Sequence, residues 1–158
     1  MEKKKIAVIR VRGTIGLKRE ARDTFRLLKL FKKNYCTIID NTPTYIGMLT
    51  KIKDYATWGE VDEKTFKELL EKRAKVVGNK RLTQDYIKQK TNLDFNTFSK
   101  EFFESKKKLK DIPGMKGFFR LAPPRKGFER KGIKLPFSLG GALGYRKDKI
   151  NDLLQRMI

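Results

Sequence analysis

The sequence predicts an α+β protein in which a core of alternating strands and helices precedes a helical insertion and a basic, extended C-terminal region. Three observations predict this fold class. Short runs rich in β-branched residues, typical of strands, alternate with amphipathic segments in the first third of the chain. Further segments with helical spacing follow, and after them glycine and proline recur too often for a long helix. The expected parts are residues 1–61, 62–105 and 106–158.

The core opens with Ile6 to Arg12, a short β-branched run that ends at Gly13 and is expected to form a strand. One face of this strand begins apolar and ends with Arg10 and Arg12, whereas the opposite face is wholly apolar and should face the core. A helix is expected over residues 17–33, because apolar residues recur there at the spacing of one helix face. That apolar stripe consists of Ala21, Phe25 and Leu28.

A second strand is expected from Tyr35 to Ile39, after Asn34 ends the helix. Proline favours the first position of a helix, so Pro43 predicts a helix start at which Thr42 is the cap. A third strand is expected over residues 55–61. The helix before it should bury one side, formed by Ile46, Leu49 and Ile52.

The helical insertion should contain three helices, with Asp62, Thr83 and Asn96 as their caps. We expect this part to pack beside the core or to form a small helical subdomain. The chain then closes with a short helix after residue 144, whose apolar stripe must dock on the rest of the protein. That stripe consists of Ile150, Leu153, Leu154, Met157 and Ile158.

The net charge of +21, from 39 basic and 18 acidic residues, indicates a polyanionic partner. So much positive charge repels itself, and a polyanion both neutralises it and releases counterions. The chain has no apolar run long enough to span a bilayer, no signal peptide and no lipidation motif. We therefore expect a soluble, intracellular protein with a nucleic acid as its partner and no membrane contact.

Two absences argue against an enzyme. The chain has no histidine, which is the commonest general base and metal ligand, and no pair of carboxylates stands out as catalytic. The single cysteine, Cys36, lies in an apolar run and is expected to be a small buried hydrophobic residue. We expect no cofactor, no metal and no small-molecule substrate.

The first candidate contact region is the glycine-containing turn before the first helix. Glycines allow a close approach of the backbone, and the following helix start offers free N–H donors to a phosphate. The spacing fits neither of the common glycine-rich nucleotide motifs, so a phosphate of an RNA backbone is the expected ligand. The basic residues nearby are Arg10, Arg12, Lys18, Arg19 and Arg22.

The second candidate contact region is the basic stretch from Lys106 to Lys134, in which glycine, proline and phenylalanine alternate with lysine and arginine. Basic side chains neutralise phosphates, and this interleaving predicts an arm that orders against a folded RNA. Its phenylalanines are expected more often to anchor the arm than to stack on bases.

The chain resembles the longer archaeal form of the large-subunit ribosomal protein L-thirty family, which is similar to the eukaryotic L-seven protein. The resemblance rests first on the strand from Ile6 to Arg12 and its Gly-Thr-Ile-Gly turn, the basic helix, and the Asp-Asn-Thr-Pro turn at residues 40–43. It continues in the helical insertion, in Arg-Leu-Ala-Pro-Pro-Arg at 120–125 and in Gly-Ala-Leu-Gly-Tyr-Arg at 141–146.

The resemblance implies a β-α-β-α-β core with an antiparallel, ferredoxin-like sheet and no catalysis. The implied function is a structural constituent of the large ribosomal subunit, in the cytoplasm, that binds and stabilises folded ribosomal RNA. The implied partners are large-subunit RNA, five-S RNA and neighbouring ribosomal proteins. Together with the first turn, the expected RNA contacts are Thr42, Thr44, Lys51, Lys53, Arg120, Arg125, Lys126, Arg130, Lys131 and Lys134.

Two other functions remain open at this point. One is a free-standing RNA-binding or chromatin-type regulatory module, and the other is an enzyme that acts on RNA. Both suit the positive charge. Only the ribosomal function predicts a protein that stays with large subunits.

Overall fold

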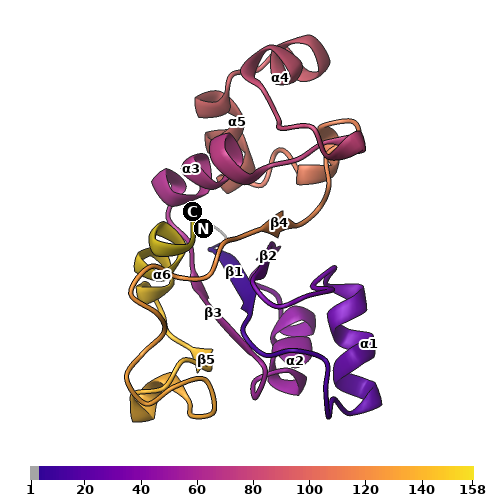
Figure 1. The fold of residues 1–158 in the computed structure, drawn as a ribbon. Helices are drawn as coiled ribbons and strands as arrows, with labels where there is room; N and C mark the ends of the chain where they lie inside the picture. The colour runs from indigo at the N-terminus through magenta and orange to yellow at the C-terminus, as the bar shows by residue number, and fades with distance from the viewer. Residues whose placement is uncertain (1–3) are drawn as a thin grey trace.

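The computed structural model describes residues 4–158, which form a five-stranded sheet with helices on both faces (Figure 1). The strand order is β4-β2-β1-β3-β5. The central strand β1 is antiparallel to both β2 and β3, which confirms the antiparallel three-stranded core. The strands are β1 (Lys5–Arg10), β2 (Tyr35–Asp40), β3 (Ala56–Glu60), β4 (Phe119–Arg120) and β5 (Gly144–Tyr145).

The two outer strands come from the C-terminal region, where we expected only extended arms and turns. β4 pairs antiparallel with β2, whereas β5 pairs parallel with β3, so these two strands extend the antiparallel core into a mixed five-stranded sheet. Each of these strands has only two residues, which is too short for the alternation of apolar residues that identifies a strand in a sequence.

Helices cover both faces of the sheet. One face carries α1 (Arg19–Leu27) and α2 (Pro43–Lys51), and the other carries α3 (Glu63–Arg73), α5 (Phe95–Phe103) and α6 (Lys149–Met157), with α4 (Gln84–Thr91) beyond them (Figure 1). Strand β1 is therefore buried on both faces. Ile6 and Val8 pack in the cluster under α1 and α2, whereas Ala7 and Ile9 pack in the cluster on the other side.

Helix α1 ends at Leu27, six residues before the predicted end. The backbone of Lys29 is left-handed, with φ of 59°, and the Leu30 N–H donates to the Phe25 carbonyl oxygen at 2.9 Å. This pattern closes a helix end. Residues 30–34 then lead back to the sheet, and Asn34, predicted to end the helix, instead takes a left-handed conformation (φ 66°) just before β2.

Helix α2 begins as predicted, with Pro43 in its first turn and Thr42 accepting a hydrogen bond from the Tyr45 N–H at 3.4 Å. Leu49 and Ile52 are completely buried, but Ile46 is exposed, contrary to expectation. Successive residues of a helix are about 100° apart around its axis, so residues three apart differ by about 60° in direction. Ile46 and Ile52 are six apart and therefore differ by about 120°, which turns Ile46 away from the buried side.

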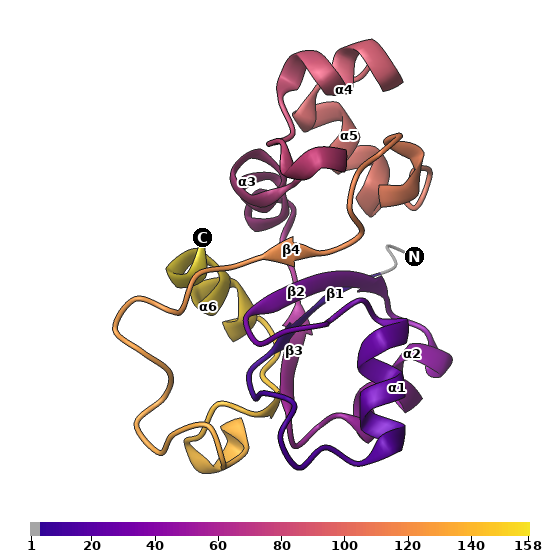
Figure 2. The ribbon, with the colours of Figure 1, turned by 45° about the vertical axis from the view of Figure 1, so that its right-hand side comes forward.

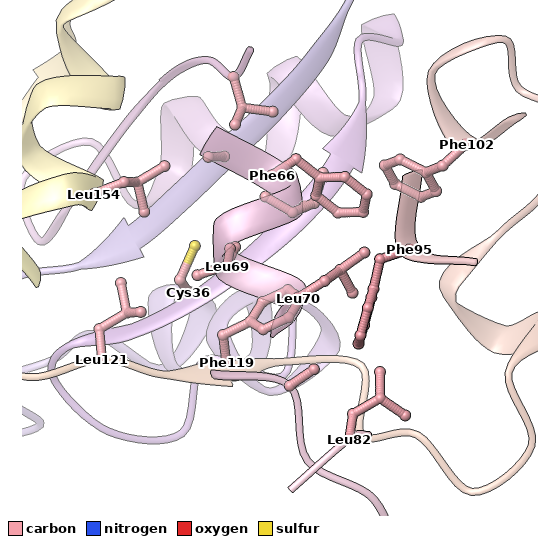
Figure 3. Close-up of a cluster of buried hydrophobic side chains, with 14 of the residues drawn as sticks. Cys36, Phe66, Leu69, Leu70, Leu82, Phe95, Phe102, Phe119, Leu121 and Leu154 are labelled. Carbon is pink, nitrogen blue, oxygen red and sulfur yellow. The ribbon is translucent and has the colours of Figure 1, made fainter. Parts of the chain in front are cut away.

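The helical insertion packs on the sheet through one shared core (Figure 3). Phe66 of α3 stacks on Phe102 of α5, with ring centroids 4.4 Å apart, and Leu154 of α6 and Phe119 of β4 belong to the same cluster. Helix α5 begins after Asp94 and not at Asn96, because Phe95 occupies its first position and is buried.

The C-terminal helix α6 docks as predicted, since four residues of its apolar stripe are completely buried. Asn151 fixes its position, because its side chain donates to the Glu60 carbonyl oxygen and accepts from the Asp62 N–H. Cys36 is also completely buried, as expected, and burial raises the pKa of its thiol. Among residues 4–158 no helix is both long and apolar enough to cross a bilayer.

Candidate nucleic-acid interface

Positive charge is concentrated in one part of the C-terminal region. Residues 112–147 contain nine basic residues and a single acidic one, Glu129. Residues 62–105, which form most of the helical insertion, contain ten basic and eight acidic residues. The segment between β4 and β5 is therefore the strongest candidate surface for a polyanion.

This segment leaves β4 and loops past α6, as Figure 2 shows, and then returns to β5, which is labelled in Figure 1. We call residues 121–136 the arm. Its first part is tied to the end of α6 by backbone bonds from Ala122 to Met157 and from Arg125 to Arg156. The Arg156 side chain also donates to the Gly127 carbonyl oxygen at 2.8 Å. These bonds hold the base of the arm in place.

The buried side chain of Arg146 holds the middle of the arm. It is 1% exposed and donates to Glu129 Oε1 at 2.7 Å, to Thr57 Oγ1 at 2.8 Å and to the Ala142 carbonyl oxygen at 2.7 Å. Its guanidinium also lies over the Phe137 ring, 4.8 Å from the centroid. Because this ion pair involves the only carboxylate of the region, the remaining arm cations have no acidic partner there.

Between the arm and the body of the protein lies a hollow of about 780 Å³, at the C-terminal end of β1. Five of its lining residues are basic and none is acidic. The other lining residues are mostly apolar or aromatic. The lining consists of Arg10, Val11, Arg12, Gly13, Thr14, Ile15, Phe31, Lys32, Lys33, Asn34, Tyr55, Pro123, Phe128, Ile133 and Lys134.

Arg12 lies at the edge of this hollow and is fixed by contacts with the start of β3. Its Nη1 donates to the Asp54 carbonyl oxygen at 3.1 Å, and its guanidinium lies 5.2 Å from the centroid of the Tyr55 ring. The Tyr55 carbonyl oxygen accepts from the N–H groups of both Val11 and Arg12. The turn that we expected to bind phosphate is thus anchored to the sheet.

Arg10, which we predicted as an RNA contact, is only 2% exposed. Its Nη1 donates to the carbonyl oxygens of Leu30 and Phe31, and its guanidinium lies 4.2 Å from the Phe25 centroid. Its Nη2 is buried and has no hydrogen-bond partner among residues 4–158. Burial lowers the pKa of Arg10, but a guanidinium stays charged in proteins. Arg10 therefore contributes its charge from behind the hollow.

An aromatic cluster supports the start of the arm. Phe118 stacks on Tyr35, with centroids 5.2 Å apart and planes 8° apart, and lies nearly perpendicular to Phe31, with centroids 5.7 Å apart. The guanidinium of Arg120 lies near the Tyr35 and Phe118 rings, at 5.8 and 6.0 Å. Arg120 is half-buried here, and Phe119 points into the core.

The other predicted basic contacts on the arm are all exposed, as are those of α1. Arg19 of α1 lies 4.0 Å from Asp23, but this pair is exposed and leaves the helix surface basic. These exposed residues are Lys18, Arg19 and Arg22 on α1, and Arg125, Lys126, Arg130, Lys131 and Lys134 on the arm.

The Thr42 turn lies at the opposite end of the sheet from the hollow. Thr42 follows Asp40, which pairs with Lys5 at the start of β1, whereas the hollow adjoins the end of β1. Lys51 and Lys53 lie at the far end of α2, on the side of the hollow. Thr42 and Thr44 therefore do not share a surface with the arm.

Sequence reasoning missed four basic residues of this region. Lys32 and Lys33 line the hollow but were assigned to the first helix, and only Asn34 signalled a break nearby. Arg146 and Arg156 hold the arm, and nothing in the charge pattern separates them from the exposed basic residues. Within the described part of the chain no group of histidine, cysteine or carboxylate side chains is placed to hold a metal ion.

Comparison with known proteins gives one family. The family model described as ribosomal protein L30p/L7e matches residues 6–56. The chain is 51% identical to the large ribosomal subunit protein uL30 of Methanopyrus kandleri over 149 residues, which cover 94% of the chain and 100% of the relative. Its identity to the uL30 proteins of Nanoarchaeum equitans and Methanococcus maripaludis is 49% and 47%, each over 96% of the chain and 97% and 98% of the relative.

Proposed function

Because this chain belongs to the ribosomal protein L30p/L7e family, in its longer archaeal form, we propose that it is a structural constituent of the large ribosomal subunit that binds folded ribosomal RNA. The main support for this function is that about half of the residues are identical to those of uL30 proteins over nearly the whole length of those proteins. The family is structural, and the chain is not an enzyme. Relatives of this kind favour the ribosome over a free regulatory module.

The surface proposed to meet the RNA is the side of the molecule that carries the arm and the hollow. Its exposed cations have no acidic neighbours in residues 112–147 apart from the paired Glu129. Neutralising many phosphates there would release counterions and supply most of the affinity. The proposed contacts are Arg12, Lys18, Arg19, Arg22, Lys32, Lys33, Lys51, Lys53, Arg120, Arg125, Lys126, Arg130, Lys131 and Lys134.

Three of the contacts predicted from the sequence, Arg10, Thr42 and Thr44, are not proposed as main contacts of this surface. Arg10 is proposed to act only through its charge, because its side chain is buried. The Thr42 and Thr44 turn is proposed as a separate, minor contact at the other end of the sheet. Five-S RNA and neighbouring ribosomal proteins are proposed as further partners, and the cytoplasm, on the ribosome, as the location.

Sedimentation tests this function. An epitope-tagged copy of the chain, expressed in a genetically tractable archaeon at native level, should travel with large subunits through a sucrose gradient. It should stay there after a wash at moderate salt, because many phosphate contacts and a folded RNA hold it. A tagged protein found mainly at the top of the gradient, free of subunits, would instead identify a free-standing RNA-binding module.

A further inference from the structure

The hollow beside the arm is lined by both basic and apolar side chains, whereas a contact with phosphate alone needs only the basic ones. Its basic residues are Arg10, Arg12, Lys32, Lys33 and Lys134, and it has no acidic residue. Such a charge balance selects an anion.

The same hollow also exposes large apolar side chains. Ile15, at the tip of the first turn, is 99% exposed, Phe31 is 48% exposed and Ile133 of the arm is 39% exposed. Single exposed apolar residues are common, but these three lie around one concave space. A phosphate gains nothing from apolar neighbours, whereas the flat face of a nucleobase does.

Arg10 supplies an independent sign that the hollow is incomplete without an anion. The residue is only 2% exposed, and although its Nε and Nη1 donate to carbonyl oxygens, within residues 4–158 it pairs with no carboxylate and its Nη2 has no hydrogen-bond partner. A buried cation without a counterion is costly. A phosphate held at the rim by Lys32, Lys33 or Lys134 would offset part of this cost through the field across the hollow.

Phe31 is prepared as a stacking surface. Its ring is nearly perpendicular to that of Phe118, which is itself stacked on Tyr35 of β2, so one aromatic ring held by the sheet supports Phe31. A ring that is held in advance loses little freedom when a base stacks on it. Base stacking on aromatic side chains is a common device of proteins that bind unpaired nucleotides.

We propose that this hollow takes one unpaired nucleotide of the bound RNA. The base lies inside, against Phe31 and between Ile15 and Ile133, and the phosphate lies at the basic rim. The volume of about 780 Å³ falls in the range of small-molecule sites, so it accommodates one nucleotide. A base-paired helix keeps its bases stacked inside and cannot fill the space. This inference rests on the proposed RNA-binding function and deepens it.

Methyl-selective NMR of isoleucine-labelled full-length protein tests the proposal. Titration with hexaadenylate should move the methyl signals of Ile15 and Ile133 upfield, because a base stacked close to a methyl group shields it. The methyl signal of Ile87, which is buried on α4 in the helical insertion and does not line the hollow, is the internal control and should not move. An abasic hexamer with the same backbone, and a twelve-base-pair RNA duplex, should bind without the upfield shifts.

The outcomes separate this proposal from the proposed function. Equal shifts with the abasic hexamer would show that the hollow takes backbone only, and would overturn the nucleotide site while RNA binding stands. Hexaadenylate that binds, as measured by fluorescence anisotropy, but leaves the methyl signals of Ile15 and Ile133 unmoved would do the same. If neither single-stranded nor duplex RNA binds at low salt, both the site and the RNA-binding function fail.

Substitution of Phe31 gives a second test. Phe31→Leu keeps an apolar side chain but removes the stacking ring, so the affinity for hexaadenylate should fall about fivefold or more, with no change for the abasic hexamer. The matched control is Leu27→Ala, an exposed apolar position on α1 that does not line the hollow, and it should bind both as the unaltered protein does. Equal losses for both oligonucleotides in Phe31→Leu would contradict a stacking role.

Discussion

Replacing Arg146 by methionine should release the arm from the body of the protein. Arg146 is completely buried and joins three elements, since it donates to Glu129 of the arm, Thr57 of β3 and the Ala142 carbonyl oxygen. Removing one partner of a buried ion pair costs about 3–5 kcal/mol, because the other charge stays buried without compensation. Glu129 is 19% exposed and keeps Arg156 at 3.9 Å, so we expect the lower end, about 3 kcal/mol.

Urea unfolding measures the free energy, and amide hydrogen exchange shows where structure is lost. The exchange of Ala142 and Arg146, whose N–H groups donate to Gly132 and Trp58, should speed up more than that of the β1 amides. The loss should be local, because the backbone bonds to α6 still hold the base of the arm when the ion pair is removed.

Two further variants test whether the loss of stability comes from the buried ion pair. Arg130→Met, an exposed arm position, should stay within about 0.5 kcal/mol of the unaltered protein. The double variant Glu129→Met/Arg146→Met should recover most of the loss, since an apolar pair of similar size often replaces a buried ion pair without cost. If Arg146→Met lost less than about 1 kcal/mol and left arm exchange unchanged, the ion pair would not be what holds the arm.

Three other outcomes follow from the fold. Leu153→Ala should destabilise the protein by about 2–5 kcal/mol in urea unfolding, because Leu153 of α6 is completely buried in the core. The substitution of its exposed neighbour, Gln155→Ala, should change stability by less than about 0.5 kcal/mol. Thr42→Ala should cost about 1 kcal/mol by removing the cap of α2, and Thr42→Asn should restore most of it; equal losses in both variants would contradict capping. Burial raises the pKa of the Cys36 thiol, which should therefore stay protonated and unreactive toward a thiol reagent at pH 9 in the native protein and react only in denaturant; rapid native labelling would show that Cys36 is not buried.

The central strands and helices were predictable because each is long enough to show its period. The four consecutive apolar residues of β1, Ile6 to Ile9, and the proline start of α2 are strong local signals, and both elements form where expected. The apolar stripe of α6 likewise predicted that this helix packs against the rest of the protein. The end of α1 was not predictable, since the left-handed turn at Lys29 has no glycine to mark it.

The candidate site was predictable only in outline. The positive charge and the recurring glycine and proline residues identified the arm. Its geometry, however, depends on contacts between residues distant in sequence, such as the ion pair of Arg146 with Glu129. The burial of Arg10 also depends on residues 30 and 31, whose carbonyl oxygens receive its hydrogen bonds after α1 ends early. A sequence pattern carries no signal for such contacts, because nothing local distinguishes a buried arginine from an exposed one.

The salt dependence of binding to a large-subunit ribosomal RNA transcript tests most directly whether the side with the arm and the hollow meets the RNA. The triple variant Lys32→Ala/Lys33→Ala/Lys134→Ala removes three exposed cations at the hollow. The slope of log affinity against log salt should become shallower by about 2 to 3, because each lost phosphate contact retains its counterions.

The matched control removes three exposed lysines from the helical insertion, Lys64, Lys72 and Lys90, and so makes the same change in net charge. This control should leave the slope nearly unchanged if the hollow and the arm carry the contacts. Equal slopes for the two triple variants, or a larger change in the control, would contradict this assignment of the RNA-binding surface.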